Sequence, residues 1–132
     1  MPVYESVALP AQTAGGATST TFISTVEMSD AQGLGVTRVI ITPPPGYTTV
    51  TGVATNNVTF NVRHLRAASA DSTAVASVTL NSGTNLVAET PLVVPITATP
   101  VLAQDDVFDV QMVQNGSGLA VGAGLFVTVD VN

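Results

Sequence analysis

The sequence contains no cysteine, no tryptophan and a single histidine, and only 9 % of its 132 residues are charged. Without cysteine, the chain has no disulfide scaffold, no thiolate metal site and no thiol nucleophile. Three Lys or Arg residues stand against nine acidic residues, and a net charge of −6 offers no basic surface to a nucleic-acid backbone. No run of about 18 apolar residues is present, so no membrane-spanning helix is expected. The N-terminal residues have neither a basic nor an apolar signal region, so a cleaved secretion signal is not expected.

The scarcity of charge has a consequence for the surface. Soluble proteins carry about 25 % charged residues. A folded chain of this mass exposes roughly 6,400 Å², which leaves about one charge per 500 Å². Because a neutral surface of that size is unusual for an independent monomer, we expect other chains to cover part of it. The composition therefore predicts an assembled protein.

Apolar and polar residues alternate with a period of two along much of the chain, which is typical of strands. The clearest strands are predicted at Val58–Leu65, Val107–Val113 and Leu125–Val131. Weaker ones are predicted at Phe22–Met28, Val36–Thr42, Thr48–Val53, Ala74–Leu80 and Leu92–Thr97. Helix is expected at most as a turn around residues 67–72. About eight short strands separated by turns predict an all-β, single-domain antiparallel β-sandwich or jelly roll. Alternation alone leaves jelly-roll and immunoglobulin-like strand orders open.

The first twenty residues differ from the rest because proline and glycine interrupt a stretch of small residues. They predict an extended N-terminal arm over residues 1–20, followed by a β-sandwich domain over residues 21–132. A loose terminus is the simpler interpretation. The alternative is an arm that is ordered by a neighbouring subunit, with four apolar contact residues: Val3, Tyr4, Val7 and Leu9.

No catalytic, cofactor-binding or metal site is predicted. His64 shares a strand face with Val62 and is expected to be a half-buried, hydrogen-bonded histidine. Asp105, Asp106 and Asp109 form the densest acidic group, but their spacing is not that of a calcium loop. A solvated turn is the preferred interpretation of this group. A small hydrolase would need Glu89 or His64 to lie beside it.

Four segments in order along the chain carry a resemblance to a known family: Thr55–Arg63, Ala76–Leu86, Leu102–Val110 and Asn115–Ala120. Together they resemble the capsid decoration, or cement, proteins of tailed bacteriophages. Two positions depart from that pattern: Gln104 precedes Asp105 where glycine is expected, and Gly122 stands near an expected proline. The resemblance implies a jelly-roll-like fold, a trimer bound to the major capsid protein on the outer surface of the virion, no catalysis and no cofactor.

The sequence thus favours a non-enzymatic structural virion protein that binds the outer face of a phage capsid and stabilises the head lattice. In that hypothesis the N-terminal arm contacts the capsid or a neighbouring subunit. The alternative is a carbohydrate- or receptor-binding β-sandwich module of a phage fibre. Sugar sites usually present aromatic rings, and the chain has no tryptophan. Tyr47, which follows a proline run, is the candidate for that role.

Overall fold

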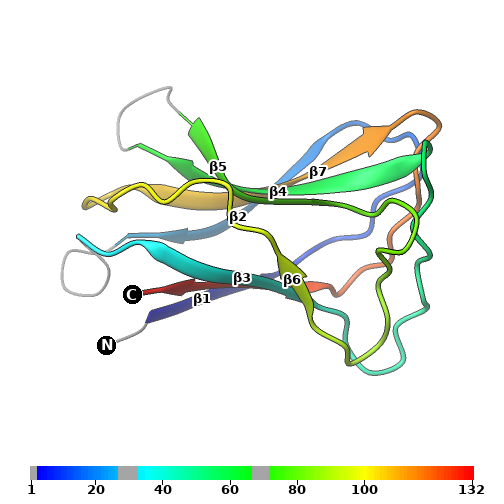
Figure 1. Cartoon of the computed structure of the whole chain (residues 1–132), viewed down its shortest axis with the longest axis horizontal. Helices are drawn as coiled ribbons and strands as arrows, with labels where there is room; N and C mark the ends of the chain where they lie inside the picture. Colours follow the sequence, from blue (N-terminus) through cyan, green and yellow to red (C-terminus); the bar gives the residue numbers. More distant parts are fainter. Residues whose placement is uncertain (1–2, 27–32, 67–71) are drawn as a thin grey trace.

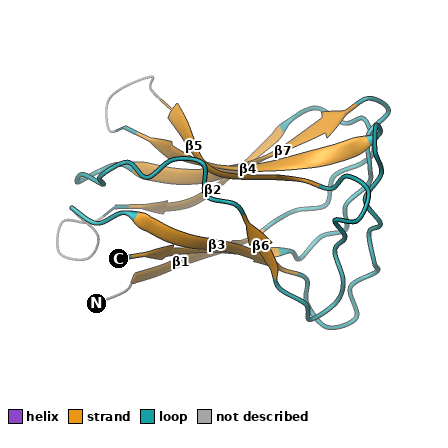
Figure 2. Ribbon diagram, in the orientation of Figure 1, coloured by secondary structure: helices purple, strands orange, loops and turns teal. Residues whose placement is uncertain are grey.

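The computed structural model describes residues 3–26, 33–66 and 72–132. Within these ranges the chain forms strands and loops only, as Figure 2 shows. The strands are β1 (Val3–Ala8), β2 (Ser19–Thr25), β3 (Val36–Thr42), β4 (Asn57–Leu65), β5 (Ser72–Thr79), β6 (Leu92–Val94), β7 (Val107–Asn115) and β8 (Phe126–Val131). The all-β prediction is confirmed. The helical turn predicted at residues 67–72 lies outside the described residues, except for Ser72, which begins β5.

The strands form two four-stranded antiparallel sheets that face each other (Figure 1). One sheet has the order β1-β8-β3-β6 and the other β2-β7-β4-β5. The first and last strands are neighbours in the first sheet, and β7 lies between β2 and β4 in the second. This is the order of a jelly roll rather than of an immunoglobulin-like sandwich, in which β1 and β2 would share a sheet.

The core lies between the sheets and is built from the inward half of each alternating strand. Val58, Phe60 and Val62 of β4 are fully buried, whereas Thr59 and Asn61 between them are partly exposed. Val127, Val129 and Val131 of β8 follow the same rule. The period-two alternation predicted for Val58–Leu65 and Leu125–Val131 is therefore confirmed, because a half-buried strand exposes alternate side chains.

Two predicted strands differ from the structure. The segment Thr48–Val53 is a loop in which Val50 makes an isolated bridge with Leu86. Buried and exposed residues alternate here because Val50 and Gly52 are buried beneath neighbouring turns, and not because the segment is a strand of a sheet. Prolines at 91 and 95 restrict the predicted Leu92–Thr97 strand to the three residues of β6, since proline cannot donate a ladder hydrogen bond. The end of the predicted Phe22–Met28 strand lies outside the described residues.

The N-terminal segment is part of the sandwich of its own chain. Val3–Ala8 pairs with β8 along its whole length as the edge strand β1, and Leu9 is buried in the core. The strand β2 begins at Ser19, just before the domain boundary predicted at residue 20. Tyr4 remains exposed at the surface. Contacts of this segment with another chain, and the division of the chain at residue 20, stay predictions.

Candidate functional site

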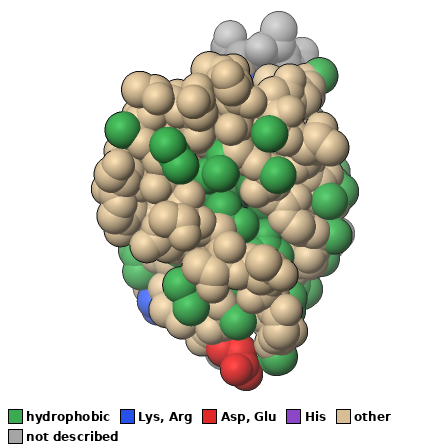
Figure 3. Space-filling model, turned by 90° about the vertical axis from the view of Figure 1, so that its right-hand side faces the viewer, with side chains coloured by type: hydrophobic (Ala, Val, Ile, Leu, Met, Phe, Trp, Pro, Cys, Tyr) green, Lys and Arg blue, Asp and Glu red, His purple; other side chains and the backbone are tan. Residues whose placement is uncertain are grey.

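Four loops meet at one end of the sandwich, on the right in Figure 1. They are residues 9–18, 43–56, 80–91 and 116–125, which join β1 to β2, β3 to β4, β5 to β6 and β7 to β8. We call this surface the loop end. Glu89 is its single charged residue. Figure 3 looks onto this end: hydrophobic side chains gather at the centre, and charged atoms are confined to the margin.

A hollow of about 870 Å³ opens in the loop end. Three of the four loops line it, and the lining has no charged side chain. The lining residues are Ala11, Gln12, Thr13, Gly46, Tyr47, Thr48, Thr49, Val50, Thr51, Leu119, Ala120, Val121, Gly122 and Ala123. Small apolar and hydroxyl side chains therefore make a neutral surface of a size typical of binding pockets.

Tyr47, the candidate aromatic of the sequence, lies at the wall of this hollow. Its hydroxyl donates a hydrogen bond to the carbonyl of Gly122, at 3.1 Å. A Cβ atom on Gly122 would lie 3.5 Å from the ring, so the ring packs directly on the glycine backbone. Burial raises the pKa of Tyr47 above its ordinary value, so the phenol remains a protonated donor at neutral pH. The tyrosine thus joins two loops across the hollow.

Beneath the hollow, two glutamine side chains fix the loops. Gln12 is buried, and its Nε2 donates to the carbonyl oxygens of Met112 and Ala17, both at 3.0 Å. Its Oε1 accepts from Gln114 Nε2 at 2.7 Å, and Gln114 also binds the backbone of Leu119. A backbone bridge joins Gln12 to Val121. Because buried amides with satisfied hydrogen bonds rigidify their surroundings, the hollow is preformed.

Sequence reasoning did not find these two glutamines. Gln12 stood in the predicted arm, and Gln114 lies at the end of a predicted strand, 102 positions further along the chain. No spacing rule connects such residues. The signal that could have pointed to them is the single charged residue, Glu89, among all four loops, because this scarcity of charge marks the same surface in the sequence.

The acidic group Asp105, Asp106 and Asp109 is divided by the fold. Asp105 is exposed, with a positive φ of 68°. Asp109 accepts two hydrogen bonds from Arg63, at 2.8 and 2.6 Å, and this contact raises the pKa of Arg63. Asp106 is fully buried and Asp109 is 6 % exposed, so the prediction of a solvated turn is wrong for both residues. Among the described residues, no group of three His, Cys, Asp or Glu side chains could hold a metal ion.

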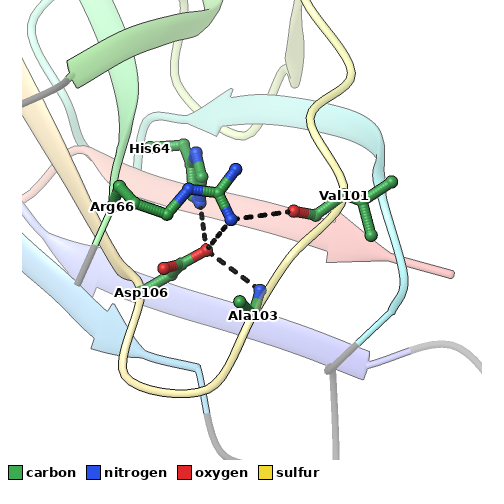
Figure 4. Close-up of polar contacts among 5 residues, drawn as sticks. All are labelled: His64, Arg66, Val101, Ala103 and Asp106. Carbon is green, nitrogen blue, oxygen red and sulfur yellow. Dashed lines mark hydrogen bonds and ion pairs between the residues drawn. The ribbon is translucent and has the colours of Figure 1, made fainter.

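Asp106 is buried because it joins a loop to the end of β4 (Figure 4). Its Oδ2 lies 2.6 Å from His64 Nε2 and 3.3 Å from Arg66 Nη1. It also accepts a hydrogen bond from the backbone nitrogen of Ala103, at 2.9 Å. His64 is therefore hydrogen-bonded as expected, but it is buried rather than half-buried. The cluster fastens the chain before β7 to β4.

This cluster does not assemble a catalytic site within the described residues. A serine or threonine nucleophile needs a hydrogen bond to its base. A small cavity of about 300 Å³ beside His64 is lined in part by Ser72 and Thr73, but no hydrogen bond joins either hydroxyl to the imidazole. The hydrolase alternative required Glu89 or His64 beside the acidic group. His64 does lie beside Asp106, at 2.6 Å, whereas Glu89 lies at the loop end, away from this group. Within the same residues, no helix is long and apolar enough to cross a membrane.

The outer face of the β1-β8-β3-β6 sheet is a second surface with little charge. Its large exposed apolar side chains are Tyr4, Phe126 and Val93, which are 65 %, 47 % and 55 % exposed. Of the predicted contact residues, Tyr4 lies on this face, Val7 is partly buried against the core, and Leu9 is buried within it. The structure therefore separates Tyr4 from Val7 and Leu9, because a strand directs alternate side chains to opposite faces.

The sequence matches no family model and no curated protein. Among solved structures, it is similar to a chain in the structure of the infectious bursal disease virus Gx strain, with a TM-score of 0.41 and 13 % identity. The match covers 98 % of this chain and 32 % of the viral chain. A similarity at that level carries no functional argument, so the conclusion below depends on the residues of this chain.

Proposed function

We propose that this chain is a non-enzymatic structural protein of a phage virion, which binds the outer face of the capsid through its loop end and stabilises the head lattice. The observation that carries the proposal is the loop end itself, where three of the four loops line a neutral hollow and all four contribute a single charged residue. The sequence resemblance to capsid decoration proteins supplies the class of partner, the major capsid protein.

The loop end has the composition of a protein-binding surface. The centres of protein interfaces are depleted in charged residues, because each buried charge loses its hydration. The hydrogen bonds of Gln12, Gln114 and Tyr47 hold the loops in one arrangement. A preformed surface loses little conformational entropy on binding, so more of the contact energy contributes to affinity.

The charged residues outside the loop end suit a surface that faces solvent on a virus particle. Apart from Glu89, the charged residues lie outside the loop end, and the net charge is −6. In the proposed orientation this acidic part of the molecule faces solvent, where like charge keeps particles apart. A three-fold oligomer on the lattice is the assembly that the resemblance suggests. Many copies, each of which binds weakly, together resist the pressure inside the head through avidity.

Co-sedimentation with empty heads made from the major capsid protein of the same phage tests this proposal. Ala120 is exposed and lines the hollow, so Ala120→Lys places a charge in the proposed interface. We expect this variant to lose capsid binding by about tenfold or more, since a desolvated unpaired charge is costly. Thr20→Lys is the matched control. Thr20 is exposed on β2, outside the loop end, so this variant should bind like the unmodified protein. Equal pelleting of the two variants, or failure of the unmodified protein to pellet, would contradict the proposal.

One observation favours a second candidate function, the binding of neutral carbohydrate. Tyr47 stands in a hollow whose lining includes four threonines, and such a surface offers a ring and hydroxyl groups to a sugar. The ring is already packed on Gly122, which leaves less of it available for stacking. A glycan array separates the two functions: binding that Tyr47→Ala abolishes supports the carbohydrate site, and an array without binding removes it.

A further inference from the structure

The outer face of the β1-β8-β3-β6 sheet has a regular arrangement of side chains. Because Val127, Val129 and Val131 point into the core, Phe126, Thr128 and Asp130 of β8 point outward. The register places each of them beside an outward residue of β3: Thr42 beside Phe126, Ile40 beside Thr128, and Arg38 beside Asp130. On β6, Val93 lies beside Ile40, and on β1, Tyr4 lies beside Asp130. The face is therefore a grid of neutral side chains with one pair of charges.

That pair is placed on the midline of the sheet. The midline of four strands runs between the second and the third, which here are β8 and β3. Asp130 and Arg38 are cross-strand neighbours at this position. Within the described residues, neither side chain takes part in an ion pair or a side-chain hydrogen bond. One positive and one negative group thus remain available for another molecule.

The arrangement is self-complementary. A two-fold axis that lies in the plane of contact and follows the midline would place β8 of one copy over β3 of the other. Asp130 of each copy would then face Arg38 of its partner, twice, and Thr128 would face Ile40. Sheets that pack in this aligned way cross at about 30°, which is compatible with such an axis. The chain is acidic overall, yet this face is balanced, so two copies can approach here without net repulsion.

We infer that the β1-β8-β3-β6 face is a two-fold contact between copies of this chain, with Arg38 of each protomer paired to Asp130 of the other. The face measures at most roughly 20 by 20 Å, since three of its strands have six or seven residues and β6 has three. This is small for a permanent dimer, so a dissociation constant of about micromolar order is expected. This inference does not depend on capsid binding, because it uses a different surface.

Sedimentation velocity from about 1 to 100 µM tests the contact, a range that brackets micromolar dimerisation. Arg38→Glu and Asp130→Arg each place like charges opposite one another, and each is expected to raise the dissociation constant at least about tenfold. Thr20→Glu, an exposed position on the other sheet, should leave it unchanged. Circular dichroism melts confirm that every variant is folded before its mass is compared.

Mixing the two reversed variants gives the decisive measurement. In the mixed pair, Glu at 38 of the first chain faces Arg at 130 of the second, and Asp130 of the first faces Arg38 of the second. Both contacts are then attractive between chains, although the neighbouring positions within each chain still carry like charges. We expect the mixture to form heterodimers while each variant alone stays dissociated. Three results would each overturn the inference. The unmodified protein is monomeric or forms only three-chain particles, its dimer is insensitive to either charge reversal, or the mixture of the two variants forms no heterodimer. Capsid pelleting of Arg38→Glu, measured separately, shows whether the proposed function fails with it.

Discussion

At the scale of single residues, Asp106 is a buried carboxylate on which several contacts converge. One fully buried oxygen meets His64, Arg66 and the backbone of Ala103. Removing one partner of a buried charged cluster leaves the others without compensation, which is more costly than losing a surface contact. The residue therefore stabilises the fold.

Asp106→Asn should lower the free energy of unfolding by about 3 kcal/mol, because the amide cannot offer a charged acceptor to three donors. Urea denaturation measures the change. Asp105→Asn is the matched control: this neighbour is exposed, and asparagine tolerates its positive φ, so a change within about 0.5 kcal/mol is expected. Equal stability of the two variants would show that the buried cluster contributes little.

At the scale of elements, the loop end depends on close contact between two connections. Gly52 lies in the loop between β3 and β4, and its backbone nitrogen donates to the side chain of Asn85 at 2.8 Å. The turn that leads to β6 passes so near that a Cβ atom on Gly52 would overlap the carbonyl oxygens of Asn81 and Thr84. Glycine is required here for space, and the contact sets the position of the loop that carries Tyr47.

Gly52→Ala should destabilise the protein by about 2 kcal/mol, since the obstacle is backbone and cannot rotate away. The expected readout is a lower melting temperature together with weaker capsid pelleting. Gly35→Ala serves as the control, because the nearest atom to its Cβ would be the oxygen of Pro100 at 4.0 Å. A Gly52 variant as stable as the Gly35 variant would mean that the two loops do not need this contact.

At the scale of the whole molecule, the charged residues lie mainly away from the end that contains the hollow. The exposed surface is 6275 Å², close to that expected from the mass, yet the end with the hollow carries one charge. The acidic residues lie mainly elsewhere and give the chain its net charge of −6. An interface made by the loop end therefore gains little from Coulomb attraction and should depend on apolar burial.

Capsid binding through the loop end should accordingly vary less than about threefold between roughly 50 and 500 mM NaCl, because salt screens charged contacts and leaves apolar ones. Co-sedimentation at graded salt concentrations measures this dependence. The dimer proposed for the sheet face is the internal comparison, since its two charge pairs predict weaker association at high salt. A steep loss of capsid binding with salt would indicate a charged interface and a different docking surface.

The sequence by itself determined the fold class, most of the strands and their buried faces, because alternation with a period of two is a local property that survives in any sheet order. The scarcity of charge also predicts that other chains cover part of the surface, which stays a prediction. Only the tertiary structure decided the jelly-roll order, the burial of Asp106 against His64, and the joining of Gln12 to Gln114 across 102 positions. Those features depend on which segments, distant in the sequence, lie together in the fold. Packing between the two sheets determines this, and no local sequence pattern contains that information.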